Sequence, residues 1–269
     1  MKPRSVIRAC GLLLCWAGGL AAGPAQGQAP AVQWDRTLGS ANDDFGQVCL
    51  PTANGGSLMA GSAEFGASGE KAQAGCGGTD YWVVKLAAGG AVQWSRVVGG
   101  DDNDWLQGAV QTPDGGFVLA GQNLGQAIAG GRVGCDKTRT NPGPAAIWVV
   151  KLSPAGALVW ERTYGTAAGG GDVGGLAAAP DGGVLVNGTC RGPAGGDKSE
   201  PGRGLDDYWV LRLDAAGAKR WDRTLGGANY DLGGVAATAD GGWLVAGVSD
   251  SGVGARKARP AGTCATTGW

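Results

Sequence analysis

Four copies of one pattern run through the chain at a nearly fixed spacing. Each copy begins with a W-x-R stretch, and the successive tryptophans are 60, 66 and 61 residues apart: Trp34, Trp94, Trp160 and Trp221. Each stretch is followed by a Gly-Gly turn, and in the first three copies an apolar strand follows the turn: DYWVVKL, AIWVVKL or DYWVLRL. A repeat of this length indicates units that stack or surround an axis, so the chain is limited to a repeat architecture.

The order of segments within one copy predicts a four-stranded antiparallel unit. In residues 45–98, FGQVCLPT and SLMAGS flank an Asn-Gly-Gly turn, a glycine-rich loop follows, and DYWVVKLA and VQWSRVV flank a second turn. Asn-Gly and Asp-Gly favour hairpins because both residues accept positive φ. The third strand is apolar on both faces, as in a sheet packed between two others. We predict an all-β fold: a β-propeller, or an open partial propeller, of four-stranded antiparallel blades.

Other repeat architectures fit less well. A β-solenoid would have shorter coils, and a helical repeat would show a period of 3.6 residues. The predicted blade-like units lie at 45–98, 105–164, 173–225 and 232–269, with the last one incomplete. The fourth-strand pattern also occurs at 32–39, and we expect that strand to close the ring by pairing with the final blade. The sequence ends at Trp269, which aligns with the third-strand tryptophans, so we expect a C-terminal portion to be lacking.

Residues 1–27 are predicted to be a cleaved export signal. Lys2, Arg4 and Arg8 precede a short apolar run and small residues, and the run is too short for a membrane span. The remaining repeat domain, 28–269, is therefore expected to be a secreted or cell-surface monomer without a membrane span. Its 19 Lys and Arg residues against 23 Asp and Glu give a net charge of −4, which argues against nucleic acid as a partner.

Two stretches, GGDKSEPGRGLDDYWVLRLDAAGAKRWDRTLGG and DYWVVKLAAGGAVQWSRVVGG, carry a resemblance to a known family. They resemble the repeats of large exported proteins of Bacteroidetes-type bacteria, which often carry a type IX secretion signal at the C-terminus. The resemblance covers residues 32–269, and it implies export and a propeller-like fold. It implies no particular activity.

The chain contains no histidine. This excludes Ser-His-Asp and Cys-His catalysis and zinc sites with imidazole ligands. None of the four glutamates recurs near an inner strand, so no acid–base pair is indicated. We predict no catalytic residue and no metal centre, and calcium is the one ion that we consider as a cofactor.

An aspartate precedes the first strand of every unit: Asp44, Asp104, Asp172 and Asp231. Because all copies share it, we interpret it as a cap that accepts hydrogen bonds from nearby backbone N–H groups. The alternative is a carbohydrate or calcium site built of carboxylates and carbonyls. The richest cluster is GDDNDW at 100–105, which makes Asp101, Asp102 and Asp104 the candidate ligand-binding residues.

Five cysteines follow the predicted signal. Cys49 aligns with apolar residues and is expected to be a buried thiol. The other four lie in or beside the loops between second and third strands, where disulfides would staple an exported chain: Cys76, Cys135, Cys190 and Cys264. Four cysteines allow three pairings, and the sequence does not choose among them. A site of four thiolates on a metal is less favoured because no C-x-x-C spacing occurs.

Several recurring or aromatic residues are assigned to the scaffold. The third-strand cations Lys85, Lys151 and Arg212 are expected to decorate outer strands, with their stems covering the aromatic rings. The aromatic residues of the inner strands are expected to pack in the core: Trp105, Phe117 and Trp243.

The second-to-third loops are long, differ between copies and share one end of the blades with the acidic loops, so we expect binding at that end. The predicted function is a non-enzymatic scaffold for binding or adhesion, with a glycan or a surface protein as partner. The alternatives are a structural spacer in a longer exported protein and a carboxylate-dependent glycan-active enzyme.

Overall fold

The computed structural model describes residues 7–10, 31–125, 136–238 and 242–250, and all regular elements in these ranges are β-strands. Blade 1 consists of β3 (Asp44–Pro51), β4 (Ser57–Glu64), β5 (Thr79–Leu86) and β6 (Val92–Val98). Blade 2 consists of β7 (Asn103–Gln111), β8 (Phe117–Leu124), β9 (Ala146–Leu152) and β10 (Leu158–Tyr164). Blade 3 consists of β11 (Gly170–Ala178), β12 (Val184–Cys190), β13 (Asp207–Leu213) and β14 (Lys219–Leu225). Blade 4 has two strands in the described residues, β15 (Asp231–Ala237) and β16 (Trp243–Ser249).

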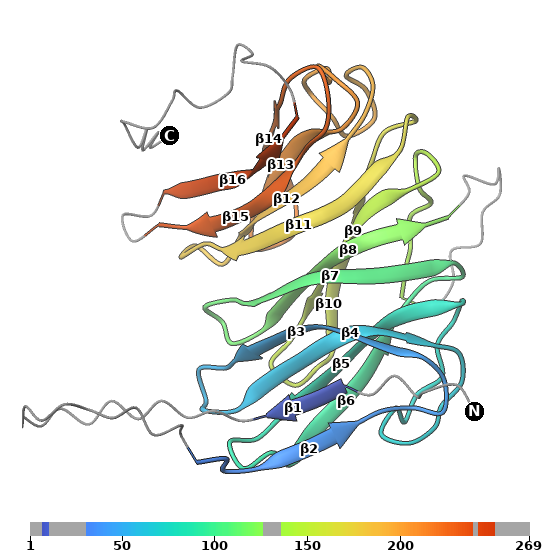
Figure 1. Ribbon diagram of the computed structural model, residues 1–269, viewed down its shortest axis with the longest axis vertical. Helices are drawn as coiled ribbons and strands as arrows, with labels where there is room; N and C mark the ends of the chain where they lie inside the picture. Colours follow the sequence, from blue (N-terminus) through green and yellow to red (C-terminus); the bar gives the residue numbers. More distant parts are fainter. Residues whose placement is uncertain (1–6, 11–30, 126–135, 239–241, 251–269) are drawn as a thin grey trace, which may run out of the picture.

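The blades follow one another as separate antiparallel sheets in an open arrangement (Figure 1). Each complete blade has its four strands in sequence order, so every connection joins neighbouring strands. The predicted all-β fold of four-stranded antiparallel blades, in its open partial form, is confirmed.

The core lies between successive blades. The third strands β5 and β9 are buried along their whole length, as their apolar character on both faces predicted. Blades 1 and 2 share one apolar cluster, which includes Leu58, Phe117 and Trp148, and blades 2 and 3 share another. Phe117 is therefore a core residue, as predicted. Trp105 is half-buried, and its ring meets Phe45 edge-on at 5.2 Å between ring centroids.

The first strands of neighbouring blades lie against one another, β7 beside β11 and β11 beside β15. Glycine permits this approach. A Cβ atom at Gly174 would lie 1.7 Å from the carbonyl oxygen of Gly233, so no larger residue fits.

In three of the four copies, the W-x-R stretch joins its unit to the following blade. Its indole Nε1 donates to a carbonyl in the third-to-fourth turn of the following blade: Trp34 to Ala88, Trp94 to Pro154 and Trp160 to Ala215. A glycine of that turn, with φ near +80°, lies on the indole ring: Gly90, Gly156 and Gly217. We call this arrangement the tryptophan latch.

The middle residue of W-x-R has a second role inside its own blade. It accepts a hydrogen bond from the third-strand indole: Trp82 to Ser95, Trp148 to Glu161 and Trp209 to Asp222. The motif therefore serves packing within and between blades.

The N-terminal strand differs from its prediction. β2 (Asp35–Leu38) pairs antiparallel with β1 (Ile7–Cys10), not with the final blade. β1 occupies the place of a third strand, since Ile7 lies opposite Leu38 as Tyr81 lies opposite Val98. β1 falls inside the predicted export signal, whose other residues lie outside the described ranges, as does Trp269. The described residues contain no helix long and apolar enough to cross a membrane.

Candidate functional site

The second-to-third loops are held by three buried lysines that the sequence analysis did not identify: Lys71, Lys137 and Lys198. Each ammonium group donates to backbone carbonyls of its own loop, for example Lys71 to Glu64 and Phe65. Burial lowers the pKa of Lys71 and of Lys137. The sequence does contain a pattern that could have identified these lysines, because an acidic residue directly precedes each of them: Glu70-Lys71, Asp136-Lys137 and Asp197-Lys198.

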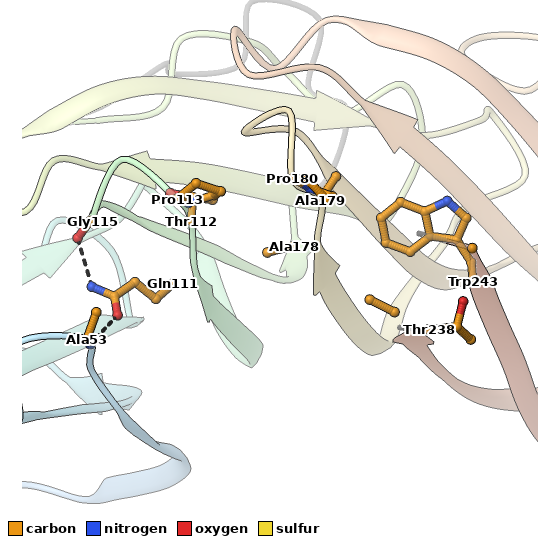
Figure 2. Close-up of a pocket in the computed structure, with 12 residues that line it drawn as sticks. Ala53, Gln111, Thr112, Pro113, Gly115, Ala178, Ala179, Pro180, Thr238 and Trp243 are labelled. Carbon is orange, nitrogen blue, oxygen red and sulfur yellow. Dashed lines mark hydrogen bonds between the residues drawn. The ribbon is translucent and has the colours of Figure 1, made fainter. Parts of the chain in front are cut away.

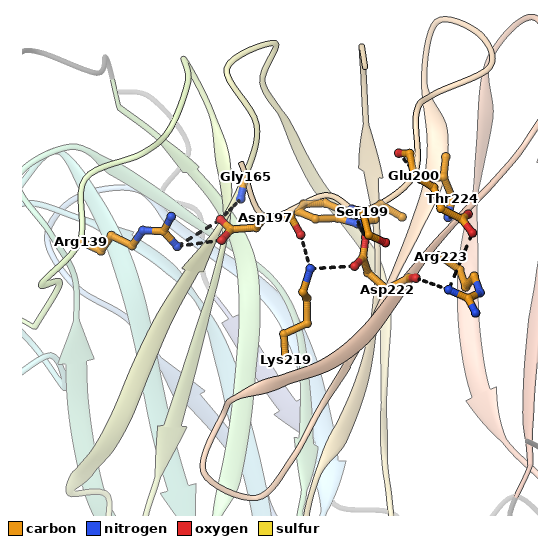
Figure 3. Close-up of polar contacts among 10 residues, drawn as sticks. Arg139, Gly165, Asp197, Ser199, Glu200, Lys219, Asp222, Arg223 and Thr224 are labelled. Carbon is orange, nitrogen blue, oxygen red and sulfur yellow. Dashed lines mark hydrogen bonds and ion pairs between the residues drawn. The ribbon is translucent and has the colours of Figure 1, made fainter. Parts of the chain in front are cut away.

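The acid of each pair ties its loop to the preceding unit. Its backbone N–H donates to the carbonyl of the glycine that follows the W-x-R strand: Glu70 to Gly39, Asp136 to Gly99 and Asp197 to Gly165. In blade 3 the Asp197 carboxylate adds two further contacts, since it accepts from the Gly165 N–H and from Arg139 of the blade 2 loop (Figure 3). Beside it, Lys219 pairs with Asp222 at 2.7 Å. The loops that we expected to bind a ligand are thus cross-linked parts of the scaffold.

Asp104, one of the three candidate ligand-binding residues, is completely buried. Its carboxylate accepts from the Gly100 N–H at 2.8 Å and from the Asn123 amide at 2.6 Å, and burial raises its pKa to about 7. Asp101 and Asp102 are exposed. Only these two candidates therefore face solvent, and their role in binding stays a prediction.

The capping interpretation holds for three of the four recurring aspartates. Asp44 and Asp231 accept from the backbone N–H four residues earlier, as Asp104 does. For Asp172 the prediction is wrong: this residue is exposed, and its carboxylate accepts from the Gln107 amide. The glycine-rich start of β11 shifts the register of its pairing with β12. As a result Gly170, which lies opposite Cys190, occupies the strand position that the capping aspartate has in the other blades.

The cysteines have different environments. Cys76 is disulfide-bonded, and its partner is not among the described side chains; Cys135 and Cys264 lie outside the described ranges. Cys190 is a free, buried thiol whose pKa burial raises to about 11, so its predicted disulfide is wrong. Cys49 is exposed and not buried as predicted. Its neighbours Val48 and Leu50 pack against the apolar cluster that blades 1 and 2 share. Cys49 lies on the opposite face of blade 1, against which no four-stranded sheet of the described residues packs.

The third-strand cations lie at the opposite end, beneath the first-to-second turns. Lys85 and Lys151 are buried rather than decorating an outer strand, which corrects that prediction. Each cation binds the polar residue at the tip of a turn: Lys85 binds Asn54, Lys151 binds Asp114 and Arg212 binds Asp181. Partial burial of Asp114 acts to raise its pKa, but hydrogen bonds from Thr112, Lys151 and Gly116 outweigh it and lower the pKa to about 2.

The first-to-second turns of the blades surround a pocket of about 480 Å³, which we call the turn-end pocket (Figure 2). Blades 1 to 4 all contribute to its wall: Ala53, Gln111, Thr112, Pro113, Gly115, Ala178, Ala179, Pro180, Ala237, Thr238, Gly242 and Trp243. The Gln111 amide is already engaged, since its oxygen accepts from the Ala53 N–H and its nitrogen donates to the Gly115 carbonyl. The ring of Trp243 forms one side, with the Arg212 guanidinium 5.6 Å from its centroid.

The described wall of the pocket is mostly apolar, and its polar side-chain groups are those of Gln111, Thr112, Thr238 and Trp243. None of the described lining residues is acidic or basic. Among the described residues, no group of three or more His, Cys, Asp or Glu could hold a metal ion. Two carboxylates elsewhere have raised pKa values because they are buried, Asp80 at about 6 and Asp104 at about 7. Neither is exposed to solvent, so a substrate has no direct access to them in this structure.

No protein-family model matches the chain. Cysteine–tRNA ligases of Shewanella baltica, from strains OS155 and OS185, are 42% identical to it over 64 residues, which cover 24% of this chain and 13% of each ligase. A solved protein of unknown function from Bacteroides caccae aligns with a TM-score of 0.42 and 12% identity, over 81% of this chain and 57% of its own. A mutant of the Synechocystis apocarotenoid oxygenase aligns with a TM-score of 0.39 and 12% identity, over 70% and 40%. The chain thus spans only part of each of these proteins.

Proposed function

We propose that this chain is a non-enzymatic, exported β-propeller-like scaffold that binds a protein partner at the turn-end pocket. The observation that carries the proposal is the pocket itself, a concave apolar surface to which all four blades contribute. Apolar concavities with few polar groups are the usual sites of recognition in proteins.

The lining favours a protein over a glycan. A sugar presents many hydroxyl groups, and each one that loses water on binding requires a polar partner. The one amide side chain in the wall, Gln111, already holds the Ala53 and Gly115 backbones. An apolar side chain from a protein segment needs only the Trp243 ring and the surrounding alanines and prolines.

A selection experiment tests this proposal. Peptides selected from a random displayed library against the full chain are titrated against the Trp243→Ala variant and, as a control, Phe65→Ala. Phe65 is an exposed aromatic residue in the second-to-third loop of blade 1. We expect Trp243→Ala to weaken binding about ten-fold or more, as loss of a central aromatic contact does, with Phe65→Ala unchanged.

Other outcomes would overturn the proposal. Binding that is insensitive to Trp243→Ala but lost in an Asp101→Ala, Asp102→Ala double variant would place the site at the acidic loop. Glycan binding that depends on Trp243 would replace the protein partner with a carbohydrate. Turnover of a glycan that disappears in Asp104→Asn would establish the enzymatic alternative.

A further inference from the structure

The second-to-third loop of blade 2 brings an amine and an amide into contact in the interior. Lys137 is 8% exposed and Asn141 is 5% exposed. The Lys137 Nζ donates to the Asn141 Oδ1 at 3.0 Å and to the Arg139 carbonyl at 2.7 Å. The amide nitrogen of Asn141 donates in turn to the carbonyl oxygens of Asn123 at 3.2 Å and Gly125 at 3.5 Å. Both ends of the amide group are therefore fixed beside the amine.

The asparagine is specific to this blade. Four residues after the loop lysine, blades 1 and 3 have a glycine instead: Gly75 and Gly202. In those blades an aspartate at the start of the third strand accepts from the backbone N–H that follows the glycine: Asp80 from Cys76 and Asp207 from Arg203. In blade 2 Ala146 stands in place of that aspartate, and Asn141 is followed by Pro142, which has no N–H to donate. Blade 2 thus has an amide against its lysine where the other blades have a capped backbone.

The surroundings favour the uncharged form of the amine. Burial lowers the pKa of Lys137, and three carboxylates oppose this effect: Asp104, Glu161 and Asp102. Asp104 lies against the lysine side chain, since a Cβ atom at Gly100 would be 3.3 Å from the Lys137 Cβ and 3.6 Å from the Asp104 Oδ2. Burial raises the pKa of this carboxyl group to about 7. The amine and the acid are therefore both shifted toward neutrality, and an uncharged amine is the nucleophilic form of lysine.

We propose that Lys137 and Asn141 react with each other to form an intramolecular amide cross-link. The lone pair of Nζ forms a bond to the Asn141 Cγ, and the Cγ–Nδ2 bond breaks with its electron pair on nitrogen. One proton passes from Nζ to the departing nitrogen, which leaves as ammonia, so the reaction requires no oxidant and no co-reactant. The fold already holds the two groups in contact, which removes much of the entropic cost of bringing reactants together. The proposal is independent of the turn-end pocket.

The cross-link would close the part of the loop that touches both neighbouring blades. The backbone N–H of Asp136 donates to the carbonyl of Gly99, which follows the last strand of blade 1. Arg139 lies between the two cross-linked residues and pairs with Asp197 of the blade 3 loop at 3.1 Å. A covalent bond at this place would restrict local opening of the loop and so preserve its contacts with blades 1 and 3.

Peptide mapping of the unaltered full chain tests the proposal. The chain is unfolded, reduced and digested with trypsin, which cleaves after Lys and Arg. Without the cross-link, Lys137 and Asn141 fall into separate peptides, 133–137 and 140–151. With it, cleavage after Lys137 is blocked, and we expect 133–139 and 140–151 as one joined species, lighter than their sum by one molecule of ammonia. A succinimide also forms with loss of ammonia, but it requires the N–H of the next residue, which Pro142 lacks.

The same digest contains a matched control. The Lys85 Nζ lies 3.1 Å from the Asn54 Oδ1, a similar contact, but Asn54 is exposed to water. We therefore expect ordinary cleavage after Lys85 and no joined species there.

Two variants identify the reacting groups. Lys137→Met keeps an apolar stem without the amine, and Asn141→Gly introduces the residue that blades 1 and 3 have at this place. Each should abolish the joined species. Separate peptides 133–137 and 140–151 from the unaltered chain, with Asn141 intact, would overturn the proposal. A joined species that persists in Lys137→Met would overturn it as well, because another residue would then supply the nitrogen. The digest of the unaltered chain decides the matter even if a variant fails to fold.

Discussion

At the scale of the residue, recurrence along the chain corresponds to structural use. Three of the four W-x-R tryptophans, the caps at Asp44 and Asp104 and the third-strand cations engage groups of the protein itself. Recurrence did not predict which of these side chains are buried. Asp104 was a candidate for binding because it lies in an acid-rich loop, yet it is completely covered and holds the Gly100 backbone.

The burial of Asp104 makes a prediction about pH. Its pKa in the folded protein is about 7, above its ordinary value of 3.8, so the folded chain retains a proton that the unfolded chain loses. The free energy of unfolding should therefore decrease as pH rises from about 4 through about 7. Asp104→Asn mimics the neutral acid and should reduce this decrease by on the order of 1–4 kcal/mol, as measured by urea unfolding at pH 4.5 and pH 8.

Two neighbours of Asp104 bear on this measurement. Asp80, whose pKa burial raises to about 6, contributes in the same direction, so some pH dependence will remain in the variant. Lys137, also buried, opposes the shift in Asp104. Asp101→Asn, at an exposed position three residues away, is the control. Identical pH dependence in Asp104→Asn and the unaltered chain would contradict the prediction.

At the scale of the element, the third-to-fourth turn is the piece that joins one blade to the next. Gly156 and Gly115 both have φ near +80°, so alanine at either position should cost about 1–2 kcal/mol of backbone strain. They differ in what a Cβ would meet. At Gly156 it would lie 2.9 Å from the Trp94 ring, whereas at Gly115 the nearest atom, in Pro154, is 3.5 Å away.

Gly156→Ala should therefore destabilise the chain more than Gly115→Ala does. The additional cost is about 1–3 kcal/mol, the usual penalty for overpacking a close contact, and urea unfolding of both variants measures it. Equal losses of unfolding free energy in the two variants would contradict the prediction, because the Trp94 ring would then accommodate the added methyl group without loss of stability.

At the scale of the whole molecule, stability should be uneven along the row of blades. β9 is completely buried between its neighbours, whereas every residue of β16 is half-buried or exposed. Local opening is easiest where few apolar contacts hold a segment. Native-state hydrogen exchange should thus show the fastest exchange in β15 and β16 and the slowest in β9. Equally slow exchange in β16 and β9 would contradict this order.

The sequence by itself determined the repeat, the four-stranded antiparallel blade, the burial of the third strand and the capping by Asp44, Asp104 and Asp231. These properties depend on short-range pattern: the period, the glycine turns, and the alternation or continuity of apolar residues.

The tertiary structure alone decided which partner each side chain meets across blades. Lys85 and Lys151 look like surface residues in a strand pattern, but they are buried because the neighbouring turn supplies acceptors at Asn54 and Asp114. The loop lysines, the pairing of β2 and the pocket around Trp243 likewise depend on groups distant in the chain. A periodic pattern records which positions face inward, whereas burial and hydrogen bonding depend on what the packed neighbour brings to each position.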